Sequence, residues 1–209
     1  MKANLVAAVT ISAALLATAV GCGDKSSAPE SSSSSASSSS SATSSAEVST
    51  SAAAAPAADD DHSGLLIDPA DIVAPGDTFT AQEPTLNPNG MAGVATVYFN
   101  GGDTREIGDT IVLLPDAEAA AAALQGAAGA LGDNVIGGAP ETVPVGSDAV
   151  MVSGTSPDGG KAVTVLLFTE GNAFTTLQFD SLPEDPVPAE FVLDVAGKQD
   201  AKIKAGLGG

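Results

Sequence analysis

The sequence predicts an α+β domain built on an antiparallel sheet of about five strands with two packed helices. Three observations support this prediction. Short apolar runs between residues 93 and 181 are separated by turn sequences rich in Gly, Asn and Asp. An alanine-rich segment interrupts them at residues 115–132, and a second helical pattern follows Pro188. Consecutive short strands with helices set apart from them are typical of an α+β domain.

The first element of the domain is the apolar segment LLIDPADI at residues 65–72. Its Asp-Pro pair predicts a short helical turn, which would dock the preceding chain onto the domain. The segment NPNG at residues 87–90 then predicts a turn, since Asn-Pro and Asn-Gly are strong turn signals.

Two strands joined by a hairpin are predicted within residues 93–115. The turn falls at NGGD, residues 100–103, because Asn and Gly accept positive φ at little cost. Successive side chains of a strand point to opposite faces of the sheet. The first strand therefore carries two pairs of neighbours on opposite faces: Val97 and Phe99 on one, Thr96 and Tyr98 on the other.

A helix that packs on the sheet is predicted over residues 115–132. Asp116 suits its start, and Glu118 suits the positive end of the helix dipole. Leu124 and Leu131 are seven residues apart and so share one face, surrounded by alanines that allow a close approach to the sheet.

Three further strands are predicted between residues 141 and 181 as an antiparallel meander. Turns at residues 157–160 and 170–172 separate them. The strand at residues 162–168 is apolar on both faces, which predicts a central strand covered twice. Its two faces are Val163, Val165 and Leu167, and Ala162, Leu166 and Phe168.

The segment after Pro188 predicts a C-terminal helix that covers the sheet. Lys198, Lys202 and Lys204 near its end complement the helix dipole and need no binding role. The stripe expected to face the core is Val192, Val195, Ala196, Gln199 and Ile203.

Residues 1–21 have the layout of a bacterial lipoprotein signal peptide. Lys2 precedes an uncharged apolar stretch at residues 5–20, which is short of the ~20 residues that a spanning helix needs. Small residues lead directly into Cys22, in a sequence, AVGC, that resembles the bacterial lipobox. This resemblance implies cleavage before Cys22 and acylation of its thiol by a diacylglyceryl group. The alternative is an ordinary signal peptide with an incidental cysteine.

Residues 22–64 are predicted to be a disordered Ser/Ala-rich linker, because Val48 is its only large apolar residue after the cysteine. About forty flexible residues span on the order of 35 Å. O-glycosylation and a bare spacer are alternative interpretations. The run DDDH at residues 59–62 reads as a solvated charge cluster, since no other His or free Cys completes a metal site.

The predicted globular domain, residues 65–209, carries 20 acidic and five basic residues. This balance argues against nucleic acid and favours solubility. No histidine and no cysteine follow residue 64, and no phosphate-binding or G-x-S-x-G motif occurs. We therefore expect no catalytic residue, cofactor or metal in the domain.

The order of signal, AVGC, Ser/Ala linker and small Ala/Gly-rich domain resembles the Lpq/Lpp lipoproteins of mycobacteria and related actinobacteria. The order of hairpin, helix, meander and C-terminal helix is similar to their PsbP-like or kinase-sensor-like ectodomains. The resemblance implies a membrane-anchored protein on the extracytoplasmic face of the cell membrane. It implies no catalytic residue.

Two functions are open from the sequence. The first is a non-catalytic module, held to the membrane through the anchor at Cys22, that binds an envelope protein, a lipid or a wall component. A lipid carrier would need a cavity between sheet and helices, whose expected lining otherwise forms the core: Val97, Phe99, Leu166, Phe168, Phe174, Leu177, Phe179 and Phe191. The second is a hydrolase acting through paired carboxylates, which needs residues such as Asp109, Glu141 and Asp180 to meet in a cleft.

Overall fold

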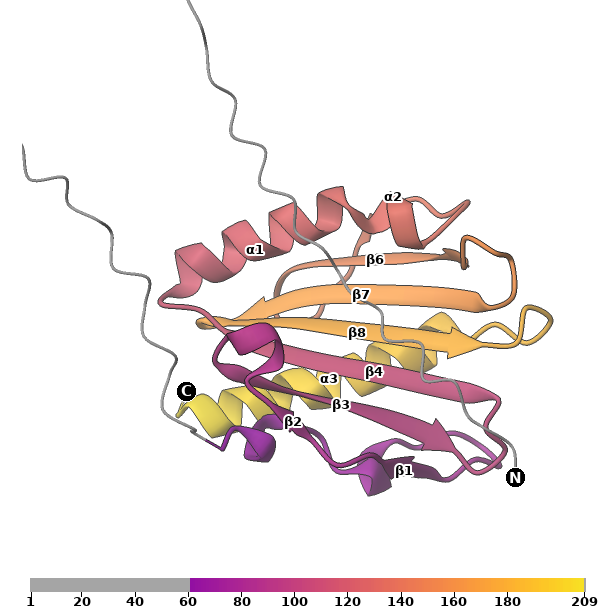
Figure 1. Ribbon diagram of the computed structural model, residues 1–209, viewed down its shortest axis with the longest axis horizontal. Helices are drawn as coiled ribbons and strands as arrows, with labels where there is room; N and C mark the ends of the chain where they lie inside the picture. Colours follow the sequence, from indigo (N-terminus) through magenta and orange to yellow (C-terminus); the bar gives the residue numbers. More distant parts are fainter. Residues whose placement is uncertain (1–60, 209) are drawn as a thin grey trace, which may run out of the picture. The chain divides into compact units, whose positions relative to one another are not determined.

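The computed structural model describes residues 61–208 (Figure 1). The predicted signal peptide, the lipidation site at Cys22 and the linker up to residue 60 lie outside the described residues. The described part contains an eight-stranded antiparallel sheet, three α-helices and three short 3-10 helices.

The strands of the sheet follow the spatial order β1-β3-β4-β8-β7-β6-β5, with β2 paired to β3 beside β1. Their bounds are β1 Phe79–Ala81, β2 Thr85–Leu86, β3 Gly93–Asn100, β4 Arg105–Leu113, β5 Glu141–Thr142, β6 Ser147–Thr155, β7 Ala162–Glu170 and β8 Ala173–Ser181. The predicted number of about five strands was too low. The missed strands β1, β2 and β5 have only two or three residues, too few to show an alternating pattern.

The predicted helix at residues 115–132 is divided into α1, Ala117–Gly129, and α2, Leu131–Asn134. Asp116 caps α1 as expected, because its side chain accepts a hydrogen bond from the backbone N–H of Ala119 at 2.8 Å. The C-terminal helix is α3, Ala189–Leu207. All five residues of its predicted core stripe are fully buried, which confirms that prediction.

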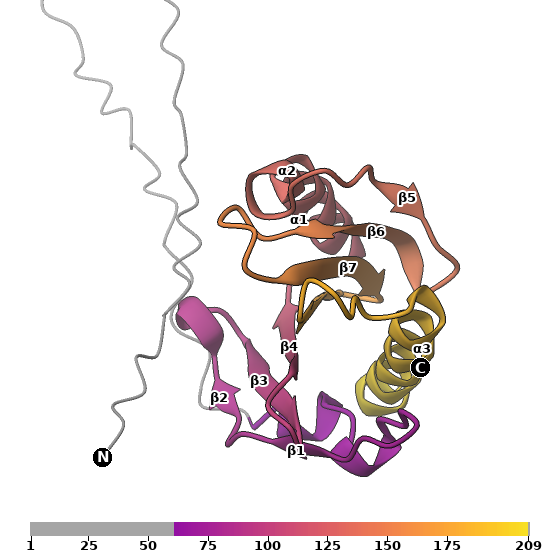
Figure 2. The ribbon, with the colours of Figure 1, turned by 90° about the vertical axis from the view of Figure 1, so that its right-hand side faces the viewer.

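The two faces of the sheet are covered by different helices (Figures 1 and 2). Helices α1 and α2 pack over β6, β7 and β8 on one face, and α3 packs on the other. Strand β7 is buried on both sides, with Val163, Val165 and Leu167 toward α1 and Leu166 and Phe168 toward α3. The prediction of a central, doubly covered strand is therefore confirmed.

The hairpin at residues 100–103 forms between β3 and β4, but the predicted core face of β3 was wrong. Val97 and Phe99 share one face, as expected, yet they are only half-buried. The fully covered face carries Thr96 and Tyr98. The sheet can bury these polar side chains because both hydroxyls donate hydrogen bonds to backbone carbonyls.

Residues 63–74, here called the N-terminal arm, complete the core on the α3 side of the sheet. The predicted helical turn at residues 65–72 appears as two 3-10 turns, η1 at Ser63–Leu65 and η2 at Pro69–Asp71; a third such turn, η3 at Pro88–Gly90, follows β2. The arm contacts α3 through η1 and β1 through η2. It buries five apolar side chains in the same cluster as β3, β4 and α3: Leu65, Leu66, Ile67, Ile72 and Ala74.

The double burial of β7 generates a stability prediction. Leu166→Ala removes a fully buried side chain from the centre of the sheet, and we expect it to lower the free energy of unfolding by about 3 kcal/mol. The matched control is Leu182→Ala, at a leucine that is 42% exposed, with an expected loss of about 0.5 kcal/mol. Urea unfolding of the two variants measures the difference. Equal losses would contradict the described packing.

Candidate functional site

The eight residues proposed to line a cavity do not lie together. Leu166, Phe168, Leu177 and Phe179 form the packed core beneath α3, where each is at most 1% exposed. Phe191 lies at the edge of this core, with ring centroids 6.1 Å from both Phe79 and Phe179. The other three lie elsewhere: Phe174 packs on the α1 side, and Val97 and Phe99 lie half-buried on the sheet face away from α3. The seam between sheet and α3 is therefore a hydrophobic core.

The three carboxylates named for a hydrolase also lie apart. Asp109 is fully buried on the α3 side of β4, in line with Ile107 and Ile111. Asp180 pairs across the sheet with Val163 and so faces the α1 side. Glu141 is exposed on the edge strand β5. These three residues therefore cannot act on one substrate atom.

The basic residues of the domain are mostly engaged in ion pairs. Lys161 bonds Asp180 at 2.8 Å and lies 3.5 Å from Glu106. Burial acts to lower the pKa of Lys161, but its hydrogen bond to Asp180 and the two carboxylates outweigh burial and raise it. Arg105 links Asp77 and Asp185, at 2.6 and 2.7 Å. These ion pairs connect strands β4 and β8 with the neighbouring loops, so we assign them a structural role.

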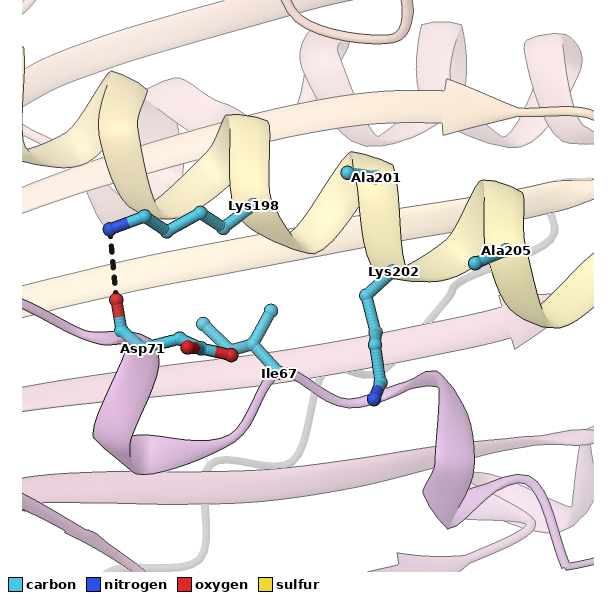
Figure 3. Close-up of a pocket in the computed structure, with 6 residues that line it drawn as sticks. All are labelled: Ile67, Asp71, Lys198, Ala201, Lys202 and Ala205. Carbon is cyan, nitrogen blue, oxygen red and sulfur yellow. Dashed lines mark hydrogen bonds between the residues drawn. The ribbon is translucent and has the colours of Figure 1, made fainter.

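A shallow groove of about 360 Å³ runs between the N-terminal arm and the outer face of α3 (Figure 3). Its lining comes from both elements: Ile67 and Asp71 from the arm, and Lys198, Ala201, Lys202 and Ala205 from α3. Lys198 bridges the groove, since its Nζ donates to the carbonyl oxygen of Asp71 at 2.9 Å and to Asp194 at 2.7 Å. Within residues 61–208, Lys202 has no ion-pair partner.

Two buried side chains, Gln199 and Tyr98, bind the backbone of the arm. Gln199 Nε2 donates to the carbonyl oxygen of Leu65 at 2.7 Å, and its Oε1 accepts from the backbone N–H of Ile67 at 3.0 Å. Tyr98 Oη donates to the carbonyl oxygen of Ile67 at 3.0 Å. One amide and one phenol thus satisfy three backbone groups of a segment that joins no strand of the sheet.

The sequence predicts that Gln199 lies on the buried stripe of α3, but it does not predict the hydrogen bonds that Gln199 makes with the arm. The available signal was a polar residue at a core position, because a buried amide requires hydrogen-bond partners. Its hydrogen-bond partner Leu65 lies more than 130 residues away in the chain, and nothing in the sequence around Leu65 indicates this contact.

Asp109 has the most unusual environment in the described domain. Its side chain is fully buried, and neither carboxylate oxygen has a hydrogen-bond partner among the described residues. Burial raises the pKa of Asp109 to about 8, so the carboxyl group is protonated at neutral pH. Burial also raises the pKa of the adjacent Tyr98, and the charges of Asp109 and Asp68 add to this effect.

Between residues 61 and 208, no three His, Cys, Asp or Glu side chains gather closely enough to hold a metal ion. Across the same range, no helix combines the length and the apolar character needed to cross a membrane.

The contacts of Gln199 generate a prediction about the arm. Gln199→Leu keeps the size of the side chain but leaves the N–H of Ile67 and the carbonyl oxygen of Leu65 buried without partners. We expect a loss of about 3 kcal/mol in the free energy of unfolding. Gln125→Leu, at an exposed position of α1, is the control, with an expected change within about 0.5 kcal/mol. A Gln199→Leu protein as stable as wild type would refute this role of the amide.

Asp109 generates a prediction about pH. In the unfolded chain its pKa is about 3.9, whereas in the folded domain it is about 8. The stabilisation gained from the bound proton is complete below pH 4 and is lost as pH rises toward 8. The free energy of unfolding should fall by up to about 1.4 kcal/mol per pH unit in this window.

Urea titrations of wild type and Asp109→Asn between pH 4.5 and 8.5 measure this slope. We expect the variant to remove it, whereas Asp133→Asn, at an exposed position of α2, should retain it. The same slope in all three proteins would show that Asp109 does not carry the effect.

The described domain shares its fold with a known bacterial ectodomain. It is similar to the crystal structure of the extracellular domain of PknH from Mycobacterium tuberculosis, with a TM-score of 0.55 and 14% sequence identity. The match covers 72% of this chain and 98% of that domain. No protein-family model matches the sequence, and no curated protein matches it significantly. The structural match thus establishes a shared fold at low sequence identity.

Proposed function

We propose that this protein is a lipid-anchored lipoprotein of the cell envelope whose domain is a non-catalytic binding or accessory module. The anchor is a diacylglyceryl group on Cys22, and the domain lies on the extracytoplasmic face of the membrane. The observation that carries the proposal is the combination of AVGC at residues 19–22 with a domain that has the fold of an extracellular domain.

The linker supports this arrangement. Some forty Ser- and Ala-rich residues separate Cys22 from the N-terminal arm. A flexible chain of this length spans on the order of 35 Å, which is enough to hold a small domain clear of the lipid headgroups. The domain is strongly acidic, so an anionic membrane surface would repel it, which is consistent with a domain held away from that surface.

A protein or wall component is a better candidate partner than a carried lipid. The core beneath α3 is closely packed, and the described groove is shallow and crossed by Lys198. Of the 20 acidic side chains that follow residue 64, only seven take part in the ion pairs of the described domain. The remaining negative charge favours a neutral or cationic partner and disfavours nucleic acid.

The alternative of a carboxylate-dependent envelope hydrolase has less support. Such an enzyme needs two carboxyl groups within about 10 Å on the two sides of one bond. Asp109 and Asp180 face opposite sides of the sheet, and Asp180 is paired with Lys161.

Replacement of the cysteine tests the anchor. In an actinobacterial host labelled with an alkynyl fatty acid, we expect wild type to carry the label and to fractionate with membranes. Cys22→Ser should lose both properties, because the thiol is the acylated group. A control that moves the cysteine, Cys22→Ser with Ser27→Cys, should also lose them, since the position within the motif matters. Label retained on Cys22→Ser would refute the proposed anchor.

The binding module is tested separately by mild crosslinking of the acylated protein in its native envelope, followed by identification of captured proteins and extractable lipids. A defined protein or wall fragment, captured by wild type and not by an unrelated lipoprotein, supports the module. A reproducible lipid without a protein partner would instead indicate a carrier. Turnover of a wall fragment by the purified domain would favour the hydrolase.

A further inference from the structure

The N-terminal arm, residues 63–74, can leave the domain without breaking the sheet. It belongs to no strand, and its single β-bridge joins Ala74 to Asp77 within the same segment of chain. Its polar attachments are the three hydrogen bonds from Gln199 and Tyr98 and one from Lys198 to the carbonyl oxygen of Asp71. Its apolar attachments are the five buried side chains Leu65, Leu66, Ile67, Ile72 and Ala74. A segment near the end of a domain that belongs to no strand opens more easily than a central strand.

The arm lies against Tyr98, a neighbour of Asp109 on the same face of the sheet. On β4, Ile107 and Ile111 flank Asp109 on the same face, and both belong to the apolar cluster that includes Ile67 and Ile72 of the arm. Figure 2 shows the arm beside α3 and β1, the two elements that its 3-10 turns contact. Removal of the arm would uncover Tyr98, the neighbour of Asp109 on this face, and so open a route for water toward the Asp109 carboxyl group.

Strands β3 and β8 offer Asp109 no compensating charge. From β3, the groups on its face are Thr96, whose hydroxyl is bonded to the carbonyl oxygen of Gln82, and Tyr98. From β8 they are Leu177 and Thr175, and the hydroxyl of Thr175 has no partner in the described part of the chain. Tyr98 is the one titratable group among these four residues.

Helix α3 and the arm also provide no positive charge that would compensate an ionised Asp109. On the buried side of α3, the amide of Gln199 is fully used by the arm, and the one charged group, Asp200, pairs with Lys204. The arm contributes Asp68, whose charge is negative. Ionised Asp109 would therefore lie in an apolar core with no compensating charge among the described residues, and only water could stabilise it.

We propose that the N-terminal arm is a pH-dependent lid, which stays docked while Asp109 is protonated and undocks when Asp109 ionises. Opening frees three hydrogen-bonding groups on the domain, the two ends of the Gln199 amide and the Tyr98 hydroxyl, beside the Asp109 carboxylate. It also lengthens the connection between the domain and the preceding chain. The lid thus couples external pH to the reach of the domain and to the exposure of the core face beneath the arm, which combines apolar side chains with these polar groups.

The expected size of the effect follows from linkage. The open state gives Asp109 an ordinary pKa, whereas the docked state holds it near 8. Between these values, the equilibrium constant for opening rises by up to tenfold for each pH unit. Asp68 and Asp71, the carboxylates of the arm, are exposed in the docked state, so their ionisation does not require the arm to open.

Hydrogen exchange of the full chain, read by mass spectrometry from pH 5.5 to 8.5, tests the lid. Exchange rates are divided by the intrinsic rate at each pH. The reporters are the arm, which includes the bonded N–H of Ile67, and strand β7 as the reference for whole-domain unfolding. The variants are Asp109→Asn, Asp109→Leu as a second, apolar replacement, and the exposed control Asp133→Asn.

We expect arm protection in wild type and Asp133→Asn to fall at least tenfold between pH 5.5 and 7.5. Strand β7 should stay more strongly protected than the arm at every pH, although its protection also falls as the domain loses stability. In Asp109→Asn or Asp109→Leu, arm protection should not change with pH. Three results would overturn the proposal: constant arm protection in wild type, the same fall in either Asp109 variant, or arm protection that equals β7 protection at every pH.

Discussion

Strand β7 sets the main constraint on this domain, because it is apolar on both faces and must be covered on both. Helices α1 and α2 provide one cover: the alanine-rich α1 packs on the sheet through Ala120 and Leu124, and α2 adds Leu131. Helix α3 provides the other, but it contacts mainly β7 and β8. The part of the same face over β3 and β4 is closed by the N-terminal arm, which is why a segment without regular structure contributes core residues.

The core on this face contains one group that is unfavourable to bury, the carboxyl group of Asp109. Residues on the α3 side of β4 alternate Ile107, Asp109 and Ile111, so that an unpaired carboxyl group replaces an apolar side chain in the core. The group is compatible with the fold in its protonated form, since a neutral carboxyl costs far less to bury than a carboxylate. The domain therefore depends on a bound proton at neutral pH, whereas most proteins depend on ionised, paired carboxylates.

The sequence predicted those features that depend on local pattern. The continuous apolar run of β7, the stripe of α3, the cap at Asp116 and the hairpin at residues 100–103 each follow from local pattern or turn chemistry, and the structure confirms them. The strands β1, β2 and β5 could not be predicted, because they are defined by pairing with longer neighbours.

The core face of β3 was chosen wrongly for a different reason. Val97 and Phe99 are more apolar than Thr96 and Tyr98, so hydrophobicity alone selects the wrong side. The correct side depends on carbonyl partners at Gln82 and Ile67, which only the tertiary structure brings into place. The burial of Asp109 was missed although a signal was available, because strand alternation places Asp109 on the same face as Ile107 and Ile111.

The most direct measurement is the ¹³C resonance of the Asp109 side-chain carboxyl group, followed by NMR from pH 3 to 9. The described core requires a titration midpoint near pH 8, and a midpoint near 4, as in a solvated carboxylate, would contradict it.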